Sequence, residues 1–329
     1  MKTKIIDLTI EKDADTKIRE AADVLKHGGL VAFPTETVYG IGADAFNEEA
    51  VRRVYEAKGR PSDNPMIVHI ARASDAGLLA SKFSPEFVKL ADAFWPGPLT
   101  MVLPKREEVP TRVTGGLDTV GIRLPDSQIA QALIKHAGTP VAAPSANLSG
   151  RPSPTKAEHV IEDLDGKVDV ILIGPECRVG IESTVIDMTT SPPCILRPGV
   201  VTADEIEAVL ETPVGYSVDS EAPRSPGMKY KHYAPKAQML VVEGAREKVK
   251  SEIERLKTLN ENLGRNVGVM LFEERDYLIA AHDFYAALRE LDEDGTDLIL
   301  AGALPETDGV GFAVMNRMLK AAGYNIARV

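Results

Sequence analysis

The sequence predicts an α/β protein in which a large, twisted, mixed sheet with helices is followed by a small three-layer parallel sheet. Residues 1–210 mix short apolar segments with amphipathic ones without strict alternation, which is typical of a mixed sheet. Residues 237–329 alternate the two kinds of segment regularly, which indicates parallel strands with helices on their faces. A proline-rich connection, residues 211–236, separates the two parts.

Length and composition limit the class of protein. A chain of 329 residues with 44% apolar residues suggests about two domains with ample cores. No apolar stretch approaches the roughly 20 residues that span a bilayer, and charged residues follow the N-terminus too closely for a signal peptide. We therefore expect a cytoplasmic protein without a membrane partner. Cys177 and Cys194 form no metal or disulfide pattern and are expected to be buried thiols.

The first clear strand–helix unit lies within residues 28–65. The apolar segment 30–33 reads as a buried strand, and hydroxyl side chains follow it at once. The next helix can be capped by Asn47 and ended by Gly59 in the left-handed conformation.

The other elements of residues 1–210 follow from periodicity and cap residues. We expect further strands at 66–71, 99–103, 119–124, 140–143, 168–173, 184–187 and 194–197. We expect helices over the apolar faces 18–25, 87–94 and 129–137, and helix starts at Ser84, at Asp126, at a Thr155–Glu158 capping box and at a Thr202–Glu205 capping box.

The pattern of residues 237–329 predicts three strand–helix pairs. Its strands are expected at 239–242, 267–272 and 298–301, and its helices at 246–259, around 284–291 and at 312–322.

The connection that precedes residue 237 is basic, because its segment 224–236 holds four Lys or Arg residues and no acidic one. The net charge of −11 argues against non-specific nucleic-acid binding but leaves room for a local cationic pocket.

Cations gather at predicted strand and helix ends, and each has a structural alternative. Lys58 and Arg60 lie at the end of a helix, where interaction with the helix dipole explains them as well as function does. Arg123 at a strand end needs an anion, which is either a substrate carboxylate or a salt-bridge partner. Ser145 and Asn147 suit an ordinary turn or a cradle for phosphate or ribose.

Weaker signals come from single residues. Ser183 precedes a strand, and Arg197 ends one. Tyr233 in the basic segment either anchors the connection or covers a bound base. The sequence holds no glycine-rich phosphate-binding fingerprint, no histidine spacing typical of zinc ligands and no nucleophilic triad motif.

Several motifs occur together along nearly the whole chain. In chain order they are FPTETVYGIG, KGR at 58–60, VGIRLP, SAN at 145–147, ESTVID, LRPG, SPGMKYKHYAP and AVMNRMLKAAG. In these motifs the chain resembles the two-domain L-threonylcarbamoyladenylate synthases. The resemblance implies a YrdC-type catalytic domain in 1–210, a linker and lid over the active site in 211–236, and a Rossmann-like domain in 237–329.

The resemblance also implies a reaction, in which L-threonine, bicarbonate and ATP give threonylcarbamoyl-AMP and pyrophosphate. It assigns catalysis to Lys58, Arg60, Ser145 and Asn147. It assigns L-threonine binding to Thr35, His69, Thr119, Arg123 and Ser183, with Arg123 on the carboxylate. It assigns ATP binding to Lys58, Ser62, Ser145, Ser153, Arg197 and Tyr233. Magnesium is expected on the triphosphate rather than in a protein-held metal site.

The implied partners act downstream. The product passes to tRNA-modifying threonylcarbamoyl-transfer proteins, so tRNA is met at most indirectly. Residues 225–235 are expected to close over the cleft and to exclude water from a labile mixed anhydride. The C-terminal domain is expected to give structural support or to dock a partner.

Two other interpretations compete with this one. The first is an RNA-binding YrdC-type module without synthase activity, which the acidic composition disfavours. The second is a carbamoyltransferase of hydrogenase maturation, whose paired Cys-x-x-Cys zinc motifs are absent from the sequence.

Overall fold

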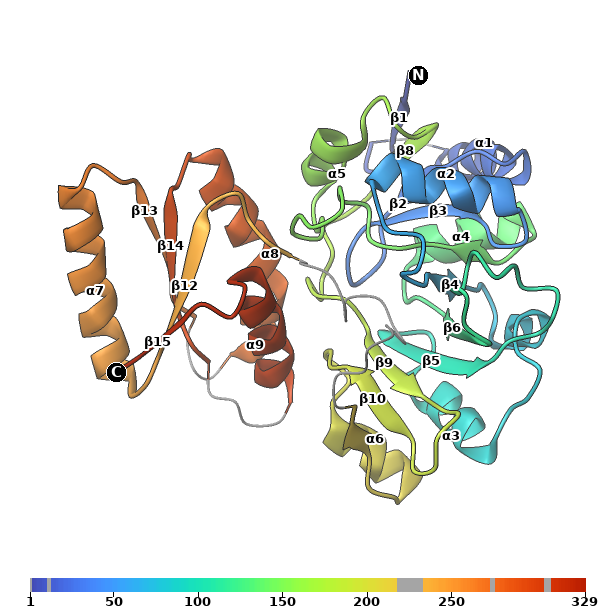
Figure 1. The fold of residues 1–329 in the computed structure, drawn as a ribbon. Helices are drawn as coiled ribbons and strands as arrows, with labels where there is room; N and C mark the ends of the chain where they lie inside the picture. Colours follow the sequence, from blue (N-terminus) through green and yellow to red (C-terminus); the bar gives the residue numbers. More distant parts are fainter. Residues whose placement is uncertain (1, 11–12, 218–232, 273–275, 305–308) are drawn as a thin grey trace.

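The computed structural model describes residues 2–10, 13–217, 233–272, 276–304 and 309–329. Within them the chain forms two α/β units that lie side by side (Figure 1). The first contains an eleven-stranded sheet and the second a four-stranded sheet. This arrangement confirms the predicted fold class.

The large sheet is mixed. Its strands are β1 (Lys4–Asp7), β2 (Val31–Phe33), β3 (Gly40–Asp44), β4 (Ile67–His69), β5 (Leu99–Pro104), β6 (Thr119–Arg123), β7 (Val141–Ala142), β8 (Val170–Ile173), β9 (Thr184–Asp187), β10 (Cys194–Arg197) and β11 (Gly215–Tyr216). Their spatial order is β1-β8-β2-β3-β7-β4-β6-β5-β9-β10-β11. Strand β4 pairs parallel with β6 and antiparallel with β7. The end of β4 therefore lies beside the end of β6 and the start of β7, although the three strands come from distant segments of the chain.

Helices cover this sheet, and most begin and end where the sequence indicates. They are α1 (Ala14–Lys26), α2 (Glu48–Lys58), the 3-10 helix η1 (Ala73–Leu78), α3 (Pro85–Phe94), α4 (Gln128–Ala137), α5 (Ala157–Leu164) and α6 (Ala203–Leu210). In α2 the side chain of Asn47 accepts a hydrogen bond from the Ala50 amide, and Gly59 takes φ 62°. The Thr202–Glu205 capping box is present at the start of α6.

Two predicted helix starts are wrong. The cap of α4 is Ser127 and not Asp126, since the Ser127 hydroxyl accepts from the Ala130 amide. Thr155 and Glu158 form no capping box; instead Nδ1 of His159 accepts from the amides of Thr155 and Lys156 at 3.3 and 3.4 Å. The imidazole thus satisfies the Thr155 amide, which the Glu158 side chain was expected to bind, together with the amide of Lys156.

The second unit has three layers. Its strands are β12 (Gln238–Glu243), β13 (Val267–Met270), β14 (Leu298–Gly302) and β15 (Ile326–Arg328), and its helices are α7 (Arg246–Asn262), α8 (Tyr277–Glu293) and α9 (Val310–Ala321). The strands pair in parallel in the order β13-β14-β12-β15. Helix α7 covers one face of the sheet, and α8 and α9 cover the face toward the first unit (Figure 1). The fourth strand, β15, was not predicted.

Gly180 lies where the first unit touches α8. A Cβ added there would lie 2.3 Å from the His282 Cα and 2.4 Å from the Ala281 carbonyl oxygen, and φ is +83°. We expect Gly180→Ala to lower the free energy of unfolding in urea by clearly more than Gly138→Ala, because backbone atoms of a helix cannot move aside. Gly138 also has a positive φ, of +69°, but nothing within 4 Å, so its change reports only the left-handed strain of about 1 kcal/mol. Equal losses would contradict this account of the contact.

Candidate active site

One pocket of the large sheet collects most of the residues that the sequence singled out. It encloses about 590 Å³, counted out to its open mouth. Eight predicted site residues line it: Thr35, Arg60, His69, Arg123, Ser145, Ser183, Arg197 and Tyr233. They come from separate segments of the chain, which the strand order brings together.

The other five predicted residues lie elsewhere. Lys58, Asn147 and Ser153 are buried and bond to residues of the pocket wall. Thr119 lines a smaller neighbouring pocket that shares Ile67 with the first. Ser62 is exposed and lines neither pocket.

Arg123 projects from the end of β6 into the pocket wall. Its Nη2 lies 2.6 Å from Oε1 of Glu36, and its Nη1 donates to the Thr37 hydroxyl at 2.9 Å. Its Nε donates to the carbonyl oxygen of Gly97 at 3.2 Å. The arginine and glutamate side chains are only 4% and 1% exposed. The salt bridge that the sequence left as the alternative is therefore present, and the contact with a substrate carboxylate stays a prediction.

His69 and Thr35 complete this side of the pocket. The Thr35 hydroxyl donates to the Val38 carbonyl oxygen at 2.7 Å and so folds the segment after β2 into a tight turn. Burial, and then the neighbouring charge of Arg123, lower the pKa of His69 to about 3. His69 is therefore neutral at physiological pH, and no described residue gives its Nδ1 a hydrogen-bond partner.

Arg197 and Ser183 form another part of the pocket wall through direct contacts. The Nε of Arg197 donates to the Ser183 carbonyl oxygen at 3.1 Å, and its Nη2 lies 3.2 Å from the Ser183 hydroxyl. That hydroxyl also lies 2.8 Å from the hydroxyl of Thr100. Burial lowers the pKa of Arg197, but an arginine pKa is high enough that the side chain stays charged at neutral pH.

The KGR and SAN motifs meet beside the pocket. The Nζ of Lys58 donates to the carbonyl oxygens of Ser145 and Asn147, and lies 3.5 Å from the Asn147 Oδ1. The Ser145 hydroxyl donates to the same Oδ1 at 2.5 Å. Burial lowers the pKa of Lys58 well below its ordinary value, and the charge of Arg60 adds to this. The lysine thus fixes the conformation of the SAN loop.

Glu182 is a pocket residue that the sequence analysis did not single out. Its carboxylate accepts from the Ser153 hydroxyl at 2.6 Å, the Tyr285 hydroxyl at 2.9 Å and the Arg317 Nε at 3.2 Å. Burial alone would raise its pKa, but the charges of Arg317 and Arg197 and the hydroxyl of Ser153 outweigh burial and hold it below its ordinary value. Glu182 belongs to the ESTVID motif, yet two of its partners lie more than 100 positions away, where no sequence spacing points to them.

Tyr233 enters the pocket from the end of the connection. It has φ 64°, is 6% exposed, and its ring centroid lies 5.4 Å from that of Tyr285. The amide of Ala234 donates to the Gly150 carbonyl oxygen at 2.8 Å. The lid predicted at 225–235 otherwise falls on residues 225–232, which lie outside the described residues.

Comparisons with known proteins identify the family. The model described as "Telomere recombination" matches residues 23–199, and "Threonylcarbamoyl-AMP synthase, C-terminal domain" matches residues 201–323. The threonylcarbamoyl-AMP synthase of Pyrococcus abyssi is 50% identical over 333 aligned residues, covering 97% of this chain and 98% of that protein. This chain belongs to the threonylcarbamoyl-AMP synthase family.

Further relatives agree with this assignment. The threonylcarbamoyl-AMP synthase of Bacillus subtilis is 47% identical, with all of both chains covered. The crystal structure of Pyrococcus abyssi Sua5 complexed with L-threonine superposes with a TM-score of 0.93 at 47% identity, again with all of both chains covered. The predicted family and function, threonylcarbamoyl-AMP synthesis by an adenylyl-transferring enzyme, are confirmed. The RNA-binding alternative without synthase activity is set aside.

Residues 2–10, 13–217, 233–272, 276–304 and 309–329 hold neither a candidate metal cluster nor a candidate membrane-spanning helix. Among them there is no group of three His, Cys, Asp or Glu side chains that could hold a metal ion. In the same ranges no helix is long and apolar enough to cross a bilayer.

The synthase is expected to lose stability in acid through two buried histidines. Burial first, and then nearby cations, lower the pKa of both His69 and His159 to about 3, whereas an unfolded histidine titrates near 6.5. Their contribution is complete above pH 6.5 and is lost as the pH falls toward 3, by about 1.4 kcal/mol per pH unit for each histidine. Urea unfolding at several pH values gives the slope of the unfolding free energy against pH. In His159→Asn this slope should be smaller than in the wild type, by the amount that corresponds to about one bound proton. An unchanged slope would contradict the lowered pKa.

Proposed function

We propose that this pocket joins L-threonine, bicarbonate and ATP. We further propose that residues 1–210 are the catalytic domain, that residues 211–236 are the linker with its lid, and that residues 237–329 are the Rossmann-like domain. One observation carries the proposal. Thr35, Arg123, Ser145 and Arg197 lie on four separate segments, and all four line one pocket. A wall of hydroxyls and guanidinium groups suits an amino acid that meets a nucleotide.

L-Threonine is assigned to the side of the pocket formed by β4 and β6. Thr35, His69, Thr119, Arg123 and Ser183 would hold it. Arg123 would bind the carboxylate while Glu36 and Thr37 keep the guanidinium in place. Neutral His69 can accept a hydrogen bond from the amine without repelling it, because its pKa is far below neutral pH.

ATP is assigned to the side formed by the KGR and SAN motifs. Lys58, Ser62, Ser145, Ser153, Arg197 and Tyr233 would bind it, with Arg60 and Asn147 completing the catalytic group. Burial lowers the pKa of Arg60 to about 10, so this residue remains a cation for the phosphates at neutral pH. The pocket's carboxylate, Glu182, already accepts from three side chains. Magnesium would therefore be held by phosphate oxygens and water, on the triphosphate.

The chemistry requires positioning and charge stabilisation. The threonine amine and bicarbonate form a carbamate with release of water, one carbamate oxygen attacks the α-phosphorus of ATP, and pyrophosphate leaves. Arg60 and Arg197 would stabilise the negative charge at phosphorus, and no enzyme nucleophile is needed. A lid formed by residues 225–235 would exclude water from the mixed anhydride. The product would pass to tRNA-modifying transfer proteins in the cytoplasm.

The proposal is tested by following pyrophosphate release from ATP. Release should require both L-threonine and bicarbonate, and serine in place of threonine should support it poorly. Release that is independent of the amino acid would contradict the assignment of the pocket.

A further inference from the structure

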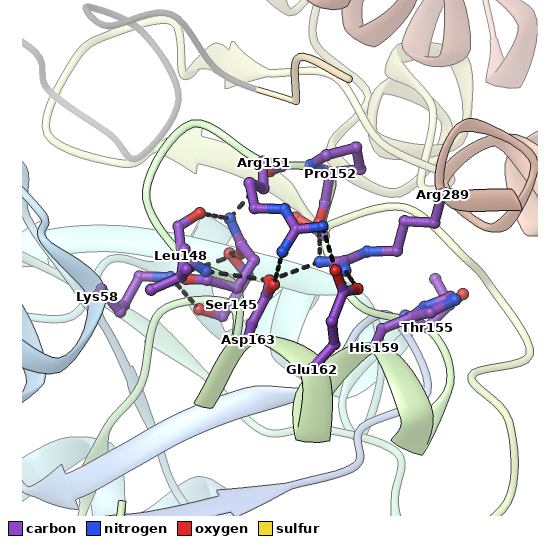
Figure 2. A network of polar contacts seen from close by, with 12 residues as sticks. Lys58, Ser145, Leu148, Arg151, Pro152, Thr155, His159, Glu162, Asp163 and Arg289 are labelled. Atoms are coloured by element: carbon purple, nitrogen blue, oxygen red, sulfur yellow. Dashed lines mark hydrogen bonds and ion pairs between the residues drawn. The ribbon is translucent and has the colours of Figure 1, made fainter. Parts of the chain in front are cut away.

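Arg289 reaches from α8 of the C-terminal unit to the segment that follows the SAN motif (Figure 2). Its side chain is 1% exposed. The Nη2 donates to the Asp163 Oδ2 at 2.7 Å and to the Pro152 carbonyl oxygen at 2.7 Å. The Nη1 lies 3.2 Å from the Glu162 carboxylate. A buried arginine with this number of acceptors holds its partners in one geometry.

Asp163 connects this guanidinium to the main chain of the loop. The aspartate side chain is 0% exposed, and its Oδ2 also accepts from the Leu148 amide at 3.1 Å. Its Oδ1 pairs with Arg151 (Figure 2). The loop 145–152 is therefore tied, directly or through Asp163, to the C-terminal unit at Leu148, Arg151 and Pro152.

Lys58 holds the other end of the same loop. Figure 2 shows Lys58 at one end of the network and Arg289 at the other. Besides its Nζ contacts to Ser145 and Asn147, the Lys58 carbonyl oxygen accepts from the Ser149 amide at 2.8 Å. The Asn147 Nδ2 donates to the Arg151 carbonyl oxygen at 3.0 Å, which links the two halves of the loop. A shift of the Arg289 end would thus be transmitted to Ser145 in the pocket.

We propose that Arg289 is a positioning residue for the nucleotide end of the active site. It holds Asp163 and Pro152 so that Lys58, Ser145 and Asn147 keep their relative places, and through it the C-terminal unit supports catalysis without touching substrate. The inference rests on the proposed function, because it takes ATP to bind beside Lys58 and Ser145. A residue that only docks the two units would instead affect both substrates alike.

The test measures steady-state pyrophosphate release and thermal unfolding of full-length variants. Arg289→Met should raise the KM for ATP about tenfold, because a displaced loop misplaces its groups, and should leave the KM for threonine within about twofold. Arg289→Lys retains the positive charge and should show an intermediate KM for ATP. The matched control is Arg255→Met, which removes an exposed ion pair with Glu252 on α7 and should change neither KM.

A double variant tests the route through Asp163. Asp163→Asn retains an acceptor for the Leu148 amide and should raise the KM for ATP by a similar factor. Asp163→Asn combined with Arg289→Met should raise it by about tenfold and not by the product of the two, since both act on one loop. Unchanged KM values with a lower unfolding temperature, or equal rises for ATP and threonine, would overturn the proposal.

The proposed function can fail separately from this inference. If Lys58→Met leaves ATP binding unchanged in calorimetry, the assignment of the nucleotide end is wrong. If Lys58→Met weakens ATP binding but Arg289→Met does not, the positioning role alone is wrong.

Discussion

Arg123→Met is expected to abolish threonine-dependent pyrophosphate release and to weaken the fold at the same time. The substitution removes the cation proposed for the threonine carboxylate, and loss of a buried charge contact of this kind weakens binding about 100-fold or more. It also leaves Glu36, which is 1% exposed, without its cation. An unpaired buried carboxylate destabilises by about 3–5 kcal/mol. Titration calorimetry with threonine and urea unfolding measure the two effects.

The double variant Arg123→Met/Glu36→Gln separates those effects. It removes both charges of the pair, so most of the lost stability should return while threonine affinity should not. ATP affinity should stay near that of the wild type. Should threonine affinity return together with stability, Arg123 would be a structural residue. Equal loss of ATP and threonine affinity in the stable double variant would lead to the same conclusion.

Glu182→Ala is expected to have the second large effect. It removes the carboxylate that neutralises Arg317, whose side chain is 0% exposed, and it leaves the hydroxyls of Ser153 and Tyr285 without their acceptor. An unpaired buried cation destabilises by about 3–5 kcal/mol. Activity should fall as well, because Glu182 lines the pocket beside Ser183. Urea unfolding and pyrophosphate release measure the two losses.

Glu162→Ala is the matched control for this change. Glu162 also pairs with two arginines, Arg151 and Arg289, but its side chain is 39% exposed, so its removal should lower stability by about 1 kcal/mol or less. Similar losses in the two variants would show that burial does not set the strength of the Glu182 contacts. Glu182→Gln retains an acceptor oxygen and should fall between the two.

The sequence predicts elements best where local signals are strong. Strands β9 and β10 have the predicted bounds of 184–187 and 194–197, since each is a short apolar segment between turn residues. Strand β3 was missed because Gly40 and Gly42 lower its strand propensity. Yet a Cβ at Gly42 would lie 2.5 Å from the Val141 side chain and 2.8 Å from the Phe33 ring, so the glycine that hides the strand is also what lets it pack.

For the active site, motifs point to residues but not to their partners. The KGR and SAN motifs are recognisable in order, and they do meet. The sequence could not distinguish the pairing of Arg123 with Glu36 from a contact with a substrate carboxylate, because either anion would explain a cation at that strand end. Arg289 gave no local signal, and Arg317 stood out only as part of the AVMNRMLKAAG motif, because each lies within an ordinary helix and its carboxylate partner is more than 100 positions earlier. Contacts across the two units follow from tertiary packing alone.

The position of β8 between β1 and β2 has a consequence for synthesis on the ribosome. A nascent chain that has emerged through β2 cannot join it to β1, because the strand that pairs with both, β8, spans residues 170–173. This edge of the sheet therefore has to wait for most of the first unit to be translated. The pocket waits longer still, until Tyr285 and Arg317 have left the exit tunnel and can reach Glu182. The enzyme should thus acquire its activity only after the chain has emerged through Arg317.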